Sequence, residues 1–471
     1  MNDAANPVDR WLACDHAWID GKMRDRVVLG IQGDRLAVVE PDSDRFVQVT
    51  AEGTHLPGAT LPGLVNAHSH AFHRALRGRT HGGPGSFWSW RDQMYAVAAA
   101  LDPDSYHQLA RAVFGEMLLA GITCVGEFHY LHHQADGGSY EDPNAMGAAV
   151  MAAAADAGIR LTLLDAVYLT GDLGDTIEQP RLNEVQQRFS DRSVDDWAGR
   201  VAGLTEGVES KEVQIGGAIH SVRAVPPAQM AAVVKRLRDL PHTSGDARVL
   251  HAHVAEQPAE VSRAQEAHGA SPVRLFADAG AVGPQFTAVH GVWLNDDDIG
   301  VLGAAGATVC ACPTTERDLA DGVVPAGRLH VAGAGLALGT DQHAVIDLFE
   351  EGRGVELDLR LSTQVRGTLD PGVLLEAATA GGARSLGWSG TGRIRAGMLA
   401  DLCVVGLDSV RLAGLPREAL AGGIVFAAIA ADVTHTIVGG RVVVADGRHH
   451  DLDVPSELAE TIALTKDRST T

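Results

Sequence analysis

Two histidines in the first third of the chain have a spacing that suits metal binding. His68 and His70 are separated by one residue and follow an apolar run. Residues two apart in a β-strand point to the same face, so both imidazoles could bind one metal ion, and neutral imidazole suits Zn²⁺. Two buried histidines with ordinary hydrogen bonds would explain the pair equally well. Its meaning therefore depends on what else the chain brings to the same place.

Three further groups have the same position relative to an apolar run. His253 ends one run with Glu256 just beyond it, His290 ends the next, and Asp341 follows the last. A buried histidine and a solvated glutamate would explain His253 and Glu256 alone, whereas Asp341 is poorly explained as a surface charge after an apolar strand. Metal-binding side chains at four strand ends predict one metal site, with Glu256 placed to act as an acid or base.

The elements that must position these side chains alternate between strand and helix. Helices are predicted to start where an aspartate precedes a proline, at 102–103, 142–143 and 370–371, while residues 312–336 are expected to form a long loop. Eight alternating strands predict an α/β fold, a closed parallel (β/α)₈ TIM barrel with its active site at the carboxyl ends of the strands. The predicted strands are 61–67, 122–127, 159–168, 213–220, 249–254, 286–290, 307–312 and 336–340.

Both ends of the chain contain short β-strand patterns. They cover 17–22, 26–31 and 35–39 near the N-terminus, and 401–405, 435–438 and 441–444 near the C-terminus. We therefore expect a small β-sandwich domain built from residues 1–60 and 393–450. The barrel is expected over 61–392, and a C-terminal tail or helix over 451–471.

Composition restricts the partners of the protein. Acidic residues number 60 and basic residues 38 in a chain of 471, giving a formal net charge of −22, which argues against nucleic acid and anionic membranes as partners. No run approaches the ~18 apolar residues of a spanning helix, and we expect no secretory signal. The five cysteines are scattered and predict no disulfide framework. We expect a cytoplasmic enzyme for a small molecule, with a homodimer as the default assembly.

The complete series of site residues, inside a barrel joined to a sandwich, resembles the amidohydrolase superfamily over nearly the whole chain. Residues 61–68 and 397–402 are also typical of that superfamily. Members with two metals carry a carboxylated lysine late on strand four, and residues 213–220 contain no lysine. The resemblance implies one divalent ion, with zinc expected and Fe²⁺ as the alternative, held by His68, His70, His253 and Asp341.

More specific segments resemble the formimidoylglutamate deiminases of this superfamily: 86–91, 127–133, 220–225, 253–257 and 314–322. This resemblance implies hydrolysis of N-formimidoyl-L-glutamate to N-formyl-L-glutamate and ammonia in histidine degradation. Because the net charge does not attract a dicarboxylate, local cations must bind it, and Arg91 and Arg223 offer guanidinium forks. Tyr130 and His220 could add hydrogen bonds. His73 stands where the family commonly has glutamine, and we expect it still to contact the substrate.

The expected mechanism gives one role to each catalytic residue. Asp341 accepts the proton of the attacking water, Glu256 protonates the leaving nitrogen, and His290 stabilises the tetrahedral intermediate. One alternative is another mononuclear deaminase, acting on a nucleobase or a guanidino compound, for which Arg91 and Arg223 would hardly matter. A second alternative is an inactive relative that serves in assembly, and the retained metal ligands argue against it.

Two other groups of ligand-type residues are interpreted as structural. His129, His132 and His133 follow the second predicted strand, and the glycines at 137–138 indicate a loop there, so no second metal is expected. Cys310 and Cys312 alternate along a strand and lack the usual C-x-x-C spacing. We expect them to pack within the barrel.

Overall fold

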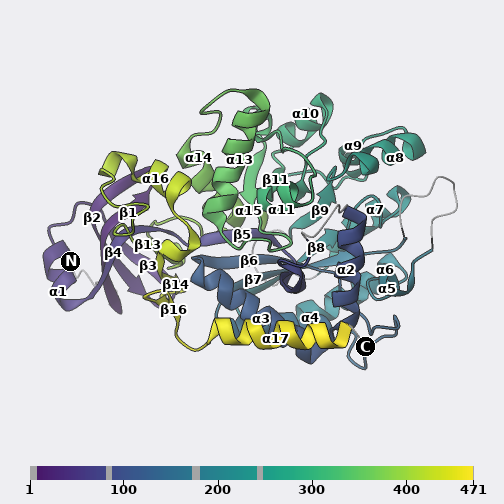
Figure 1. Cartoon of the computed structure of the whole chain (residues 1–471), viewed down its shortest axis with the longest axis horizontal. Coiled ribbons are helices and arrows are strands. Elements are labelled where there is room, and N and C mark those ends of the chain that lie inside the picture. The colour runs from purple at the N-terminus through teal and green to yellow at the C-terminus, as the bar shows by residue number, and fades with distance from the viewer. Residues whose placement is uncertain (1–7, 81–86, 172–180, 241–247, 470–471) are drawn as a thin grey trace, which may run out of the picture.

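The computed structural model describes residues 8–80, 87–171, 181–240 and 248–469 and contains two eight-stranded sheets (Figure 1). One sheet forms a barrel surrounded by helices, and the other is built from the two ends of the chain. Ser86, the first residue of one predicted motif, lies outside the described residues. Among the described helices, none is both long and apolar enough to cross a membrane.

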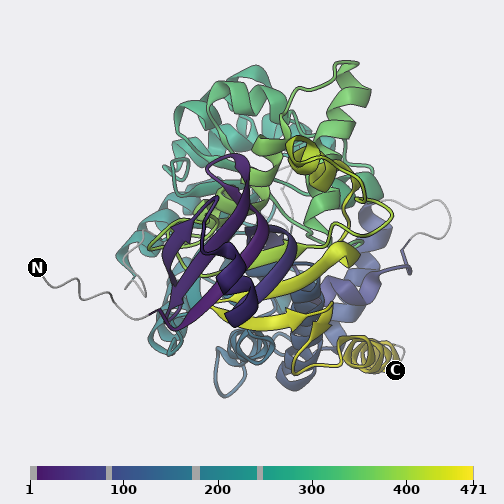
Figure 2. The ribbon, with the colours of Figure 1, turned by 90° about the vertical axis from the view of Figure 1, so that its left-hand side faces the viewer.

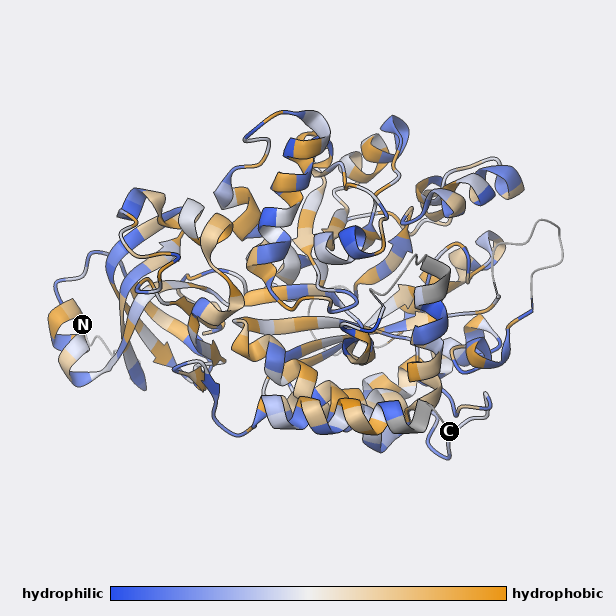
Figure 3. Cartoon of the chain, in the orientation of Figure 1, coloured by the Kyte–Doolittle hydropathy of each residue, from blue (hydrophilic) through white to orange (hydrophobic). Residues whose placement is uncertain are grey.

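The barrel contains the eight strands that the sequence predicts, all parallel and paired in chain order. Their residues are almost entirely buried, and hydrophobic side chains concentrate along them (Figure 3). The α/β barrel prediction is therefore confirmed. The strands are β5 (Leu64–Ser69), β6 (Ile122–His129), β7 (Arg160–Val167), β8 (Val213–Ile219), β9 (Leu250–Val254), β10 (Phe286–His290), β11 (Thr308–Ala311) and β12 (Gly335–Leu338).

Closure of the barrel joins the first strand to the segment that follows the last. Ser69 and Asp341 form an isolated parallel bridge. The backbone N–H of Asp341 donates to the carbonyl of His68 at 3.0 Å, and the N–H of His70 donates to the carbonyl of Asp341 at 3.2 Å. Closure thus places the two histidines beside the aspartate.

Helices connect the strands, together with the 3₁₀ segments η1 (Ala71–Leu76), η3 (Arg417–Ala419) and η4 (Ala430–Asp432) and the π-helical segment η2 (Ala377–Gly381). The C-terminal helix α17 packs against α3 and α2. The helices are α1 (Phe46–Glu52), α2 (Phe87–Ala100), α3 (Pro103–Leu119), α4 (Ala145–Ala157), α5 (Glu184–Gln187), α6 (Val194–Glu206), α7 (Pro227–Asp239), α8 (Pro258–His268), α9 (Pro272–Asp278), α10 (Asp296–Ala304), α11 (Pro313–Asp318), α12 (Ala326–Ala332), α13 (Leu348–Thr363), α14 (Pro371–Glu376), α15 (Gly382–Ser385), α16 (Leu420–Ala427) and α17 (Val454–Ser469).

Two of the three predicted helix starts are confirmed. Asp102 caps α3 by accepting from the N–H of Ser105, and Asp370 caps α14. The third prediction is wrong, because α4 begins at Ala145 after Asn144, and Asp142 instead accepts from the N–H of Asn144 in a turn. The loop expected over 312–336 is also wrong. It contains α11 and α12, which are too short to give a clear hydrophobic period.

The second sheet interleaves the two ends of the chain, as Figure 2 shows by the purple and yellow strands side by side. Antiparallel pairing of β13 with β4 places Leu402 opposite Pro62, so this sheet holds the chain just before β5. The buried Arg160 side chain of β7 also donates to Asp401 at 2.7 and 3.2 Å. In order across the sheet, the strands are β16 (Arg448–His449), β15 (Arg441–Ala445), β14 (Val433–Val438), β13 (Leu402–Val405), β4 (Thr54–Pro62), β1 (Arg10–Ile19), β2 (Lys22–Gln32) and β3 (Arg35–Glu40).

Candidate active site

Three imidazoles and one carboxylate converge at the carboxyl ends of the barrel strands. His68 lies in β5, His70 directly follows it, His253 lies in β9, and Asp341 comes after β12. The Nε2 atom of His253 lies 3.2 Å from Nε2 of His68 and 3.4 Å from Nε2 of His70. Oδ1 of Asp341 lies 3.3 and 3.5 Å from the same two nitrogens. All four side chains are buried, and their ligand atoms lie within 4.8 Å of one another.

The hydrogen bonds of these histidines fix which nitrogen faces the centre. Nδ1 of His70 donates to the Phe128 carbonyl at 2.9 Å, and Nδ1 of His253 donates to the His220 carbonyl at 2.8 Å. Burial lowers the pKa of His70 to about 3 and holds the pKa of His253 well below its usual value. Each ring is therefore neutral, with a lone pair on Nε2 directed at its neighbours. Facing lone pairs beside a carboxylate fit a divalent metal ion.

Three residues at or just after the ends of barrel strands have left-handed backbone. The φ angles are +52° at Ala255, +69° at His290 and +40° at Asp341. Such a conformation costs about 1–3 kcal/mol at a non-glycine residue and clusters at active sites.

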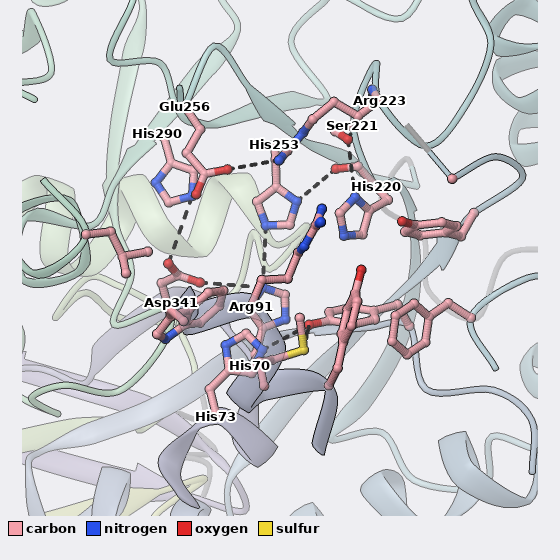
Figure 4. Close-up of a pocket in the computed structure, with 18 residues that line it drawn as sticks. His70, His73, Arg91, His220, Ser221, Arg223, His253, Glu256, His290 and Asp341 are labelled. Atoms are coloured by element: carbon pink, nitrogen blue, oxygen red, sulfur yellow. Dashed lines mark hydrogen bonds and ion pairs between the residues drawn. The ribbon is translucent and has the colours of Figure 1, made fainter. Parts of the chain in front are cut away.

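His290 lies among carboxylates on the side of the pocket opposite His73 (Figure 4). Its Nε2 is 3.9 Å from both Glu256 Oε1 and Asp341 Oδ2, and its Nδ1 is 3.4 Å from Glu316 Oε1. Burial by itself lowers the pKa of His290, but the three carboxylates outweigh it and raise that pKa to about 10. The three carboxylates thus favour the protonated form of this side chain, which can donate to negative charge that develops beside it.

The five residues predicted to bind the substrate come from four different parts of the barrel. His73 lies in η1 and Arg91 in α2, Tyr130 follows β6, and His220 and Arg223 follow β8. All five line one pocket together with His70, His253, Glu256, His290 and Asp341. Figure 4 shows Arg91 and Arg223 extending toward the same space. Every predicted site residue is therefore brought together there, with His68 fully buried beside it.

His73 contacts another predicted binding residue directly. Its Nε2 lies 2.9 Å from the Tyr130 hydroxyl, and its ring stands edge-on to that of Trp90 at 5.2 Å. Burial holds the pKa of His73 well below its usual value, so the imidazole is neutral. A neutral imidazole keeps one donor and one acceptor, as a glutamine side chain also does.

Arg223 links the predicted acid to a residue that the sequence analysis missed. Its Nη2 donates to Glu256 Oε2 at 3.0 Å, and its Nε lies 3.4 Å from Oε2 of Glu260. The other oxygen of Glu260 accepts the N–H of Ala255 at 3.0 Å. Burial raises the pKa of Glu260 to about 7, with Arg223 opposing that shift. Its position four residues after Glu256, on the first turn of α8, was the available signal.

A second residue that the sequence analysis missed, Glu127, forms hydrogen bonds to the segment that contains His68 and His70. Glu127 accepts from Ser69 Oγ at 2.5 Å, from the N–H of Ala71 at 2.7 Å and from the Tyr106 hydroxyl at 3.3 Å. Burial raises the pKa of this carboxyl to about 8. His343 lies 3.1 Å from the same serine. This network ties the first strand to the last, and no spacing in the sequence indicates it.

The other histidine group has a different partner. His129, His132 and Asp165 lie close enough to hold an ion, but Arg200 donates to both oxygens of Asp165 at 2.7 Å. Nε2 of His132 lies 2.9 Å from the carbonyl of Ala166. The carboxylate is therefore already neutralised by a guanidinium, which fits the structural interpretation.

The packing predicted for the C-x-C pair is confirmed. Cys310 and Cys312 are buried, unpaired thiols. They contact Ala67, Val289 and Ala337 in a cluster inside the barrel. Their alternation follows from the two-residue period of the strand.

Comparison with known proteins identifies the family. The Amidohydrolase family matches residues 59–443, and the chain belongs to that family. It is 36% identical over 426 residues to formimidoylglutamate deiminase of Pseudomonas aeruginosa, covering 88% of this chain and 90% of that protein. It is 30% identical to a 5-methylthioadenosine/S-adenosylhomocysteine deaminase of Natronomonas pharaonis, covering 83% of each. The protein is thus a metal-site amidohydrolase related to deaminases.

Solved structures agree with the fold. An amidohydrolase from Brucella melitensis matches with a TM-score of 0.87 and 28% identity, covering 97% of this chain and 100% of that one. An adenosine deaminase from Xanthomonas campestris, solved with bound zinc, matches with a TM-score of 0.81 and 23% identity, covering 99% of each chain. At that identity the second match shows the shared architecture alone.

Proposed function

We propose that this protein hydrolyses N-formimidoyl-L-glutamate to N-formyl-L-glutamate and ammonia, a step of histidine degradation. The observation that carries the proposal is the presence of two arginines, Arg91 and Arg223, in the pocket that the metal ligands line. A dicarboxylate substrate needs fixed cations in a chain of net charge −22. The 36% identity to the Pseudomonas enzyme supports the same substrate.

The proposed chemistry divides among the residues at the barrel mouth. The three histidines and Asp341 would hold a divalent ion, which when bound would lower the pKa of a water from ~15.7 to roughly 7. Asp341 takes the proton of the attacking water, and its Oδ2 lies on the side of His290. In its protonated form, Glu256 gives a proton to the nitrogen that leaves as ammonia and takes back the hydroxyl proton of the collapsing intermediate, while Asp341 returns its proton to solvent. His290, held as a cation, donates to the oxygen at the attacked carbon.

The binding residues orient the linear substrate along the pocket. Arg91 and Arg223 take the carboxylates, while Tyr130, His220 and His73 hydrogen-bond the remaining polar atoms. Arg223 also contacts Glu256 in the structure. Substrate binding at this guanidinium therefore positions the proposed acid at the same time.

Arginine variants test the proposal against the alternative deaminase functions. Arg91→Met and Arg223→Met should each lower kcat/KM for N-formimidoyl-L-glutamate by about tenfold to a hundredfold, as expected for a lost hydrogen bond to a charged group. Arg236→Met, at an exposed arginine paired with Asp195, is the matched control. Unchanged kcat/KM in both pocket variants would contradict the proposal, because only a substrate without carboxylates, such as a nucleobase, does not need these cations.

A further inference from the structure

The end of the pocket that contains the two arginines also contains two tyrosines. Tyr95 lies one helical turn after Arg91 on α2, with the Arg91 guanidinium carbon 5.6 Å from the centre of its ring. Tyr168 follows β7, and its ring stands edge-on to that of His220 at 4.8 Å. Both tyrosines line the pocket together with Arg223.

A single buried amide contacts both hydroxyls. Nε2 of Gln186, a residue of α5, lies 3.0 Å from the Tyr168 hydroxyl and 3.3 Å from the Tyr95 hydroxyl. The backbone fixes the orientation of this amide from both sides. Nε2 donates to the carbonyl of Gly171 at 2.9 Å, and Oε1 accepts the N–H of Asn183 at 2.9 Å.

In this orientation the amide nitrogen of Gln186, and not its oxygen, faces both tyrosine hydroxyls. An amide nitrogen donates and does not accept, and one of its two protons goes to the Gly171 carbonyl. The hydroxyl oxygens therefore share the other proton, and neither tyrosine can donate its own proton to this nitrogen. Burial raises the pKa of Tyr95 and of Tyr168 above the ordinary value, with Arg91 opposing the shift in both, so both hydroxyls stay protonated at neutral pH. Neither O–H group therefore donates to the Gln186 nitrogen, and the Tyr95 hydroxyl has a further side-chain hydrogen bond with Asn183.

We propose that Tyr95 and Tyr168 form a carboxylate subsite with Arg91, and that Gln186 is the positioning residue whose amide nitrogen leaves both hydroxyl protons to the substrate. The inference rests on the proposed function and specifies how one carboxylate of its substrate is recognised. Phenolic donors beside a guanidinium fork suit a carboxylate, which accepts through two oxygens. A carboxylate at this end of the substrate would accept the phenolic protons, which the Gln186 nitrogen cannot accept.

Single-site variants with three substrates test the subsite. Tyr168→Phe should raise KM for N-formimidoyl-L-glutamate by roughly tenfold to a hundredfold and leave kcat nearly unchanged. Gln186→Glu should raise KM further, because its carboxylate would accept the tyrosine protons and repel the substrate. Tyr140→Phe, outside the pocket residues, is the control.

The other two substrates are the formimidoyl derivatives of 4-aminobutyrate and 2-aminobutyrate, each of which lacks one carboxylate. The KM effect of Tyr168→Phe should persist with one derivative and disappear with the other. Equal KM changes with all three substrates, or a loss confined to kcat, would overturn the subsite.

A binding measurement separates failure of the subsite from failure of the proposed function. If the unaltered enzyme releases no ammonia from any formimidoyl compound, the proposed function fails. Calorimetric titration with glutarate then tests the subsite alone, and weaker binding by Tyr168→Phe than by the unaltered protein is expected. Equal affinity, or no glutarate binding at all, would refute it.

Discussion

Replacing Glu256 with glutamine should separate metal binding from proton transfer. Glu256 is only 6% exposed, and its oxygens lie 3.0 Å from Arg223 Nη2 and 3.9 Å from His290 Nε2. Glutamine keeps the size and the hydrogen-bonding capacity but has no acidic proton to give. Loss of a general acid costs about 10² to 10⁴ in rate, or about 2.7–5.4 kcal/mol in the activation barrier. We therefore expect Glu256→Gln to lose that factor in kcat.

Metal content and ammonia release should be measured on the same samples. Glu256 is not among the four metal-ligand residues, so Glu256→Gln should bind as much zinc as the unaltered protein. Asp341→Asn is the control, because it removes a ligand and should lose both metal and turnover. A kcat for Glu256→Gln within about tenfold of the original would refute the acid role. Loss of zinc from that variant would show that Glu256 acts as a ligand instead.

Three further predictions concern the metal, a buried ion pair and pH. Chelation should abolish turnover and lower Tm, since an ion at a hundred times its Kd stabilises by about 2.7 kcal/mol, and full activity after verified removal would contradict this. Arg200→Met should destabilise by about 3–5 kcal/mol in denaturant unfolding because two buried carboxylates lose their partner, whereas Arg395→Met, at an exposed pair, should cost under about 1 kcal/mol. Burial lowers the pKa of His251 to about 4, below its unfolded value, so stability should fall as pH drops from 6.5 to 4. His251→Gln should weaken this dependence of stability on pH between 6.5 and 4, and an unchanged dependence would contradict the role given to His251.

Hydrophobic patterning predicts the barrel well because its strands are buried on both faces. Each of the eight apolar runs corresponds to a strand, as β7 and β10 illustrate. Short helices are harder to predict from the sequence. Helices α11 and α12 have six and seven residues, which is less than two turns and too few for a helical repeat of hydrophobic residues to be recognised. Asn144 occupies the N-cap position of α4 without a side-chain cap hydrogen bond, and its amide donates to the Arg200 carbonyl instead. Asp142 and Asn144 are both residue types that suit an N-cap. Sequence alone does not determine which of them the fold uses.

The candidate site likewise contains some residues that the sequence predicts and others that it does not. Residues at strand ends, such as His253 and Asp341, are predictable because the barrel gathers all strand ends at one mouth. Tyr168 had the same signal, as the residue after β7, and Tyr95 shared a helix face with Arg91. Gln186 had none. Its role depends on contacts with two distant segments of the chain, which periodicity and spacing do not encode.

The most direct test of the central claim is ammonia release by zinc-loaded protein offered one substrate at a time. The panel contains N-formimidoyl-L-glutamate, 5-methylthioadenosine, S-adenosylhomocysteine, 8-oxoguanine and N-guanidino-L-glutamate. We predict strong turnover of the formimidoyl compound alone. Turnover of a purine or guanidino compound, with none of N-formimidoyl-L-glutamate, would contradict the proposed function while leaving the metal site intact.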